Sequence, residues 1–334
     1  MKIIENTNFL STFKIQITSG QPRIYNNGHQ QIEITVTYQP AKNVELSEEQ
    51  LNSLRLVTSK GGEFQELSDE FTVSTTRDPR FKYFQDPRGP SNVRAPEVIA
   101  GQNIKTFYIS STHEAEVPIN LHAAMNKDDD LVAITGTKYF NSSCIITTAN
   151  PDLILSRQDF TFWGEDVHEE DLSYWHGGQK TTRELDVDVY HLSFKDPRNR
   201  LVESVKAEEG TVGEGEPWFH KKFGADASWF FSSHESRTHT HIAYTVGTKL
   251  SFSNEHITIN VSGRNVMKFV RVKIYEKHSS FPVSVKTVNE RSVWLLRDQN
   301  GNTHKIEMFT ESNGNIPNFK VIESHYYDRL IAQR

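Results

Sequence analysis

The stretch Ile32-Glu33-Ile34-Thr35-Val36-Thr37-Tyr38 places an apolar side chain at every second position. Because successive side chains of a β-strand point to opposite faces, this period of two is typical of a strand with one buried face. Phe13, Ile15 and Ile17 show the same period upstream, and the turn-rich Asn26-Asn27-Gly28 lies between the two stretches. We therefore expect the chain to open with a β-hairpin.

Strand-like alternation continues along most of the chain. Further apolar alternation occurs near residues 71–73, 107–109, 117–121, 132–134, 242–246, 257–261, 270–274 and 293–296. A polar segment that ends at Asn150-Pro151 separates two such groups. We therefore predict an all-β protein with long ordered loops and little helix. It has two β-sandwich-like units: an immunoglobulin-like unit at 1–148 and a second β-rich unit at 149–334.

Four local patterns refine this prediction. Ser47-Glu48-Glu49-Gln50 is a capping-box pattern and predicts a short helix. Asn300-Gly301 predicts a type I′ hairpin turn, which needs positive φ at both central residues. Four prolines between 79 and 96 predict a loop, as does the Asp-Pro-Arg tripeptide within it and again at 196–198. The acidic stretch 160–215 is expected to be irregular, apart from a strand at 189–194.

Composition excludes several classes of protein. The chain has 334 residues, a net charge of −6 and 11% aromatic residues, so neither disorder nor a basic nucleic-acid-binding surface is expected. No apolar window reaches about 18 residues, so no membrane span is expected. The single cysteine, Cys144, excludes an internal disulfide, and its apolar surroundings favour a buried, unreactive thiol. No apolar run follows Lys2, so we expect synthesis in the cytoplasm and release, if any, by lysis or a non-classical route.

The familiar signatures of catalysis are missing. The sequence contains no GxxxxGK[ST], HExxH, CxxC or GxSxG pattern. These absences remove the sequence support for most common enzyme classes and leave the question of catalysis open, with a non-enzymatic role favoured. The sequence therefore supports a fold class better than it supports an activity.

A histidine cluster is the first candidate site. His239 and His241 are two residues apart, so on a strand both imidazoles point to one face, as in an HxH metal site, and His234 is a candidate third ligand. Ile242 and Tyr244 should face the core, which puts the histidines on the outer face of the strand. A divalent metal is therefore a candidate cofactor. The alternative interpretation is a polar outer strand face that binds nothing.

An aromatic and acidic cluster is the second candidate site. Aromatic rings stack on sugars and carboxylates accept hydroxyl protons, so a carbohydrate or cation platform is predicted from five residues, Trp163, Glu165, Asp166, Tyr174 and Trp175. The alternative interpretation is a solvated loop whose aromatic side chains anchor it to the protein.

Two classes of function remain open. The first is a non-enzymatic structural or recognition protein that self-associates or binds a surface, as part of a particle, an appendage or a toxin-associated module, with a carbohydrate or protein partner. The second is a metal-dependent or carbohydrate-active protein that uses His239 and His241. Self-association is expected through residues 249–261, which have no proline and few charges.

Overall fold

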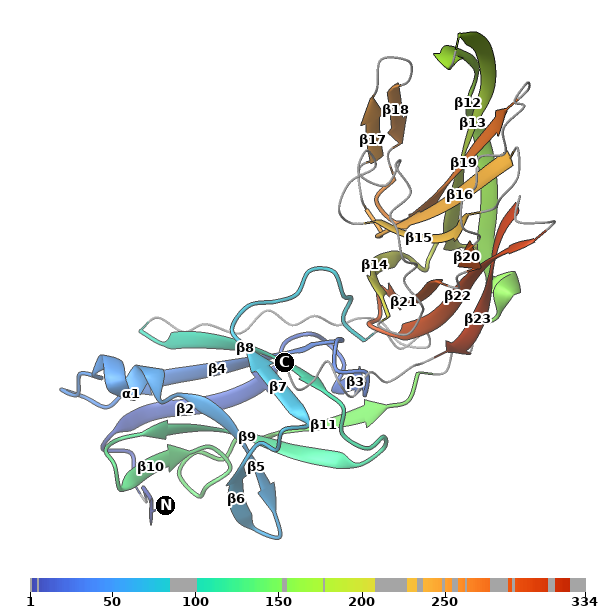
Figure 1. Cartoon of the computed structure of the whole chain (residues 1–334). Helices are drawn as coiled ribbons and strands as arrows, with labels where there is room; N and C mark the ends of the chain where they lie inside the picture. The colour runs from blue at the N-terminus through green and yellow to red at the C-terminus, as the bar shows by residue number, and fades with distance from the viewer. Residues whose placement is uncertain are drawn as a thin grey trace. The chain divides into compact units, whose positions relative to one another are not determined.

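The computed structural model describes residues 2–4, 6–84, 101–151, 155–176, 178–207, 227–232, 237–247, 250–253, 258–261, 263–276, 288–289, 292–311 and 316–324. The chain divides into two compact units, residues 1–152 and 153–328. The described elements are almost all strands, which confirms the all-β class (Figure 1). No helix among the described residues is long and apolar enough to cross a membrane.

The first unit contains two sheets. A seven-stranded sheet contains β1 (Lys2–Ile3), β3 (Arg23–Tyr25), β5 (Arg55–Lys60), β6 (Glu63–Glu66), β9 (Pro118–Asn126), β10 (Leu131–Ile134) and β11 (Cys144–Ala149). A four-stranded sheet has the order β2 (Leu10–Ile17), β4 (Ile32–Pro40), β8 (Asn103–Ser111) and β7 (Phe71–Ser74). One apolar core joins them, with Phe13, Ile34 and Ile109 from the smaller sheet and Leu121, Met125 and Ile146 from the larger. The unit is therefore sandwich-like.

The opening strands pair as expected but not through a hairpin turn. β2 and β4 are antiparallel, with Ile15 opposite Val36. Between them the chain crosses to the other sheet, where β3 pairs in parallel with β11. Because the expected turn at Asn26-Asn27-Gly28 follows β3, it belongs to this crossover and not to a hairpin.

The capping-box prediction is confirmed. Helix α1 (Glu48–Asn52) begins after Ser47, whose side chain accepts the N–H of Gln50 while the Gln50 side chain accepts the N–H of Ser47. Cys144 is buried in the core, and burial raises the pKa of its thiol to about 12. A thiol held in the neutral form is a poor nucleophile, as expected for a buried structural cysteine.

Two of the Asp-Pro-Arg tripeptides form the same turn. The carboxylate of Asp78 accepts both the backbone N–H and the guanidinium of Arg80, and Asp196 holds Arg198 in the same way. The pKa of Asp78 is lowered, first by its hydrogen bond with the Arg80 side chain. The tripeptide is thus turn chemistry, as predicted, and the described part of the proline-rich loop, 76–84, contains no strand.

The second unit is also built from packed sheets. A six-stranded sheet has the order β12 (Phe160–His176), β13 (Gln179–Phe194), β19 (Met267–Glu276), β16 (Arg237–Tyr244), β15 (Ala227–Ser232) and β20 (Val288–Asn289). A four-stranded sheet has the order β14 (Leu201–Lys206), β21 (Ser292–Asp298), β22 (Thr303–Glu311) and β23 (Ile316–Ser324). A short helix, η1 (Arg157–Asp159), precedes β12. The two sheets share a core that includes Leu192, Phe269, Trp294, Met308 and Phe319.

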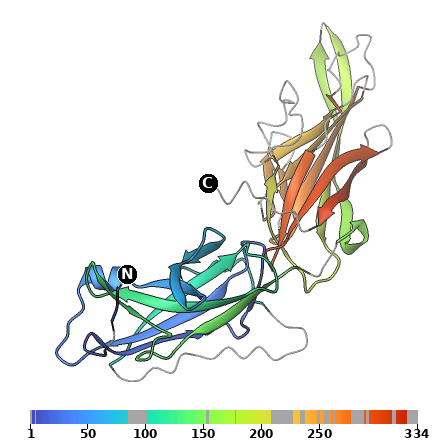
Figure 2. The ribbon, with the colours of Figure 1, turned by 90° about the horizontal axis from the view of Figure 1, so that it is seen from below.

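The expectation that residues 160–215 are mostly irregular is wrong. β12 and β13 form a long antiparallel hairpin that pairs from Phe160 and Phe194 to His176 and Gln179. Its tip extends beyond the neighbouring strand, because the pairing of β13 with β19 ends at Arg183 (Figure 2). The acidic residues interrupt the apolar alternation by which a strand is recognised in a sequence. They are compatible with a strand here because β12 lies at the edge of its sheet, and an edge strand tolerates charges on either face.

The Asn300-Gly301 hairpin forms, but not with a type I′ turn. Gly301 has a φ of 83°, whereas Asn300 is not in the left-handed region. The turn is organised by the Asp298 carboxylate, whose Oδ1 accepts the N–H of Asn300 at 2.7 Å and that of Asn302 at 2.9 Å. Asp298 is itself buried, so these hydrogen bonds offset the cost of removing its charge from water.

His122 is a buried histidine on the outer face of the seven-stranded sheet. Its Nε2 lies 3.0 Å from Oγ of Ser59, and the ring of Phe64 packs edge-on at 5.0 Å. A Cβ on Gly136 would lie 2.3 Å from Nδ1 of His122, so only glycine fits there. Burial lowers the pKa of His122.

This environment predicts acid sensitivity. The folded state binds the His122 proton more weakly than the unfolded state, whose histidines titrate near pH ~6.5. The free energy of unfolding should therefore fall as the pH drops below about 6.5, and less steeply in His122→Gln. Urea denaturation at several pH values measures this, and identical pH slopes for the two proteins would contradict it.

Candidate functional site

One face of the six-stranded sheet carries a row of charged side chains. Asp166 of β12 lies opposite Asp188 of β13, Asp188 lies opposite Arg271 of β19, and Arg271 lies opposite His241 of β16. Farther along the strands, the next row contains Glu169, Asp186, Lys273 and His239. The rows are two residues apart on β13, β19 and β16, and on β12 the register shift between Asp166 and His168 adds one residue, so both rows lie on the same face of the sheet.

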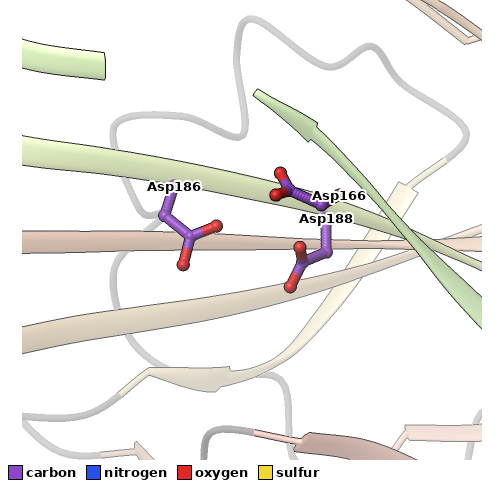
Figure 3. A group of neighbouring side chains, drawn as sticks. All are labelled: Asp166, Asp186 and Asp188. Carbon is purple, nitrogen blue, oxygen red and sulfur yellow. The ribbon is translucent and has the colours of Figure 1, made fainter. Parts of the chain in front are cut away.

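Three of these carboxylates lie close together. Each of Asp166, Asp186 and Asp188 has an oxygen within 4.8 Å of the others, an arrangement that can hold a cation (Figure 3). Figure 3 shows Asp186 and Asp188 on one strand and Asp166 on the strand beside it. Exposed acidic groups often cluster without an ion, so the charges around them decide the interpretation.

Arg271 supplies a cation to this cluster. Its Nη2 lies 2.8 Å from Oδ2 of Asp186 and also contacts the carboxylate of Asp188. Lys273 Nζ lies 3.3 Å from Asp186 and 3.3 Å from Glu184. Burial raises the pKa of Asp188, and the Arg271 charge opposes that shift. Arg271 therefore supplies the positive charge that a bound metal ion would otherwise supply to these half-buried carboxylates.

The predicted histidine site is placed differently from expectation. His241 is fully buried, so the prediction of an outer-face position is wrong for this residue. The reason is that β16 is covered on both faces: Ile242 and Tyr244 are buried on one, and Ala243 packs into the core on the other. His241 lies opposite Arg271 and His239 lies opposite Lys273, and neighbouring cations oppose metal binding. The His239 side chain and all of His234 lie outside the described residues.

The predicted aromatic and acidic platform is divided between two faces. Trp163 and Glu165 lie on one face of β12, whereas Asp166 joins the charged row on the other. Tyr174 and Trp175 occur near the tip of the hairpin, opposite Thr181 and Lys180, and their side chains lie outside the described residues. The segment is a strand, so the alternative of a solvated loop is wrong for its backbone.

Trp163 is held by its neighbour across the hairpin. Its ring stacks on His191, with centroids 4.1 Å apart and planes 16° apart. Nε2 of His191 lies 3.9 Å from Oε2 of Glu165. Burial is the main cause that lowers the pKa of His191, with Lys268 acting in the same direction and Glu165 against it.

Gly164 allows this arrangement. It lies opposite Tyr190, and a Cβ at this position would approach that ring to 2.6 Å. Tyr190 stacks on Phe162 on the core side of the strand, at 5.6 Å between centroids. The sequence Trp-Gly-Glu thus exposes Trp163 and Glu165 on one face while an aromatic core closes over the other.

Sequence interpretation missed four central residues: Asp186, Asp188, His191 and Arg271. A signal was present, because Leu185-Asp186-Val187-Asp188-Val189 alternates apolar and acidic residues, and Arg271-Val272-Lys273 alternates basic and apolar ones. Two strands with complementary charges at the same spacing are candidates to pair. Neither a protein-family model nor a curated protein sequence matches this chain, so the site rests on geometry alone.

Removing Arg271 tests its role. Arg271→Ala removes the cation that contacts Asp188 and leaves Asp186 with Lys273, and the free energy of unfolding should fall by about 3–5 kcal/mol. Calcium, which binds carboxylate oxygens, should restore part of this loss in the variant but leave the wild-type protein unchanged. Thermal unfolding with and without calcium measures both effects.

A partly exposed ion pair provides the control. Lys320 Nζ lies 3.0 Å from Glu307, and the Lys320 side chain is 52% exposed whereas that of Glu307 is 11% exposed. Lys320→Ala should lower the free energy of unfolding by less than Arg271→Ala does, because half of the Lys320 side chain is already in water, and calcium should have no effect on the variant. An equal loss in both variants would contradict the special role of Arg271, and calcium stabilisation of the wild-type protein would favour a metal site.

Proposed function

We propose that the protein is a non-enzymatic structural or recognition component that self-associates through residues 249–261. The observation that carries this proposal is a contrast between strand edges within the second unit. β17 (Leu250–Ser253) and β18 (Thr258–Val261) pair only with each other among the described strands. A two-stranded sheet is marginally stable by itself, so added strands or a packed neighbour would stabilise it.

Specific groups close part of two other edge strands, β23 and β2. On β23, the last strand of its sheet, Pro317 has no N–H and the N–H of Phe319 is taken by Oδ1 of Asn318 at 2.8 Å. At the edge strand β2, the Ser142 hydroxyl accepts the N–H of Ile15 and donates to its carbonyl, each at 3.0 Å. These contacts leave an incoming strand fewer groups to pair with.

The edge of β12 is protected by charge. Five acidic residues between 165 and 171 lie on this strand, and its register shifts between Asp166 and His168. Repulsion between like charges opposes pairing of two copies along this edge, and a bulge twists the edge away from a partner. By comparison, residues 249–261 contain only Lys249, Glu255 and His256 as charged or titratable residues. This contrast favours β17 and β18 as the self-associating surface.

The test is a charge placed on the proposed surface. Thr258→Lys should weaken self-association, because two copies brought together would bury or oppose the added charges. Sedimentation velocity and light scattering at micromolar concentration should give a species heavier than the 38.3 kDa monomer for the wild-type protein and a smaller average mass for the variant.

Ile322→Lys is the matched control, because it adds the same charge to an exposed isoleucine on the closed edge strand β23. It should leave self-association unchanged. A monomeric wild-type protein would refute the proposal, and an effect of Ile322→Lys equal to that of Thr258→Lys would move the interface to β23.

A further inference from the structure

Trp163 is exposed and held in place at the same time. The side chain is 43% exposed, although its ring stacks on His191, which is only 6% exposed. Because His191 is buried, one face of the indole rests on a ring that has little freedom to move. The ring is therefore ordered before any ligand arrives, which lowers the entropy cost of binding.

The position of Trp163 in the sheet leaves its outer side open to a ligand. β12 is the first strand in the order of its sheet, and among the described strands only β13 pairs with it. His191 belongs to β13, so it covers the indole ring of Trp163 from the side of that neighbouring strand. A flat ligand can approach the exposed part of the indole from solvent.

Polar groups lie next to this ring. Glu165 is two residues along the same face, its side chain is 49% exposed, and its Oε2 is 3.9 Å from Nε2 of His191. That nitrogen is buried and has no hydrogen-bond partner within the described structure. A carboxylate accepts hydroxyl protons, so Glu165 offers an acceptor beside the stacked ring of Trp163.

We propose that Trp163, Glu165 and His191 form a shallow site for one pyranose ring of a glycan without acidic groups. The C–H face of the sugar stacks on Trp163, and its hydroxyls donate to Glu165 while His191 supports the indole ring from its other face. The inference extends the proposed recognition role by naming a ligand class, and it does not depend on the interface at residues 249–261.

Charge determines the kind of sugar. Beyond the bulge, Glu170 lies on the same face as Glu165, and its carboxylate is 3.3 Å from His168 Nε2. The excess of carboxylates repels uronic and sialic acids, whereas a neutral or amine-bearing pyranose meets no such repulsion. A single ring stacked on an open surface should bind weakly, with a Kd on the order of 1 mM.

The test is a titration of the full chain, in which NMR signals of the indole N–H groups are followed with methyl β-galactoside, methyl β-glucoside and methyl β-glucuronide. The Trp163 signal, assigned by its loss in Trp163→Phe, should shift with at least one neutral glycoside and not with the glucuronide. Trp163→Ala should weaken binding by about tenfold or more with an unchanged melting temperature. Glu165→Gln should weaken neutral binding and reduce the discrimination against the glucuronide.

Glu169→Gln is the matched control, because Glu169 is an exposed acid on the opposite face of the same strand. It removes the same charge and should leave glycoside binding unchanged. No shift of the Trp163 signal up to about 50 mM glycoside, far above the expected Kd, would overturn the inference. Equal binding by wild type and Trp163→Ala would also overturn it, and neither result would alter the sedimentation outcome that tests self-association.

Discussion

The ion pairs of Arg271 with Asp186 and Asp188 are the interaction on which the second unit most depends. They join β13 to β19, a strand far away in the sequence, on a sheet whose opposite face at this point is apolar and buried. A shift of register by one residue would move Arg271 to the opposite face, where Val187, Val189 and Val270 are buried. The ion pairs therefore specify which residues face each other as well as contributing stability.

The strand register that these ion pairs specify also determines which residues lie on each face of the hairpin β12–β13. On the face that carries Asp188, the strand changes from an aromatic core near Phe162 and Tyr190 to the charged rows. On the other face, Trp163 and Glu165 reach solvent beside the buried His191. The same register that closes the ion pairs thus fixes the exposed ring, so the stability of the sheet and the geometry of the proposed sugar site have one origin.

The edge strands of this protein differ in how far their unpaired backbone groups are protected from pairing with another chain. A proline and a side-chain amide close part of β23, a serine hydroxyl closes part of β2, and a run of carboxylates protects β12. Unpaired backbone groups are a template for uncontrolled association, so closed edges restrict contacts to chosen surfaces. The protected edges and the ordered, exposed Trp163 are the observations that support the proposed recognition role.

The sequence alone determined the local features of this protein. Alternation around residues 32–38 predicted strands, Ser47 and Gln50 predicted a capped helix, and the apolar neighbours of Cys144 predicted its burial, because each depends on residues adjacent along the chain. The tertiary structure decided the rest. A period of two shows that a residue lies on one of two faces, but not which distant strand pairs with it or whether both faces are covered. The burial of His241, the ion pairs of Arg271 and the stacking of Trp163 on His191 all arise from pairing across the sheet, and so only the folded chain reveals them.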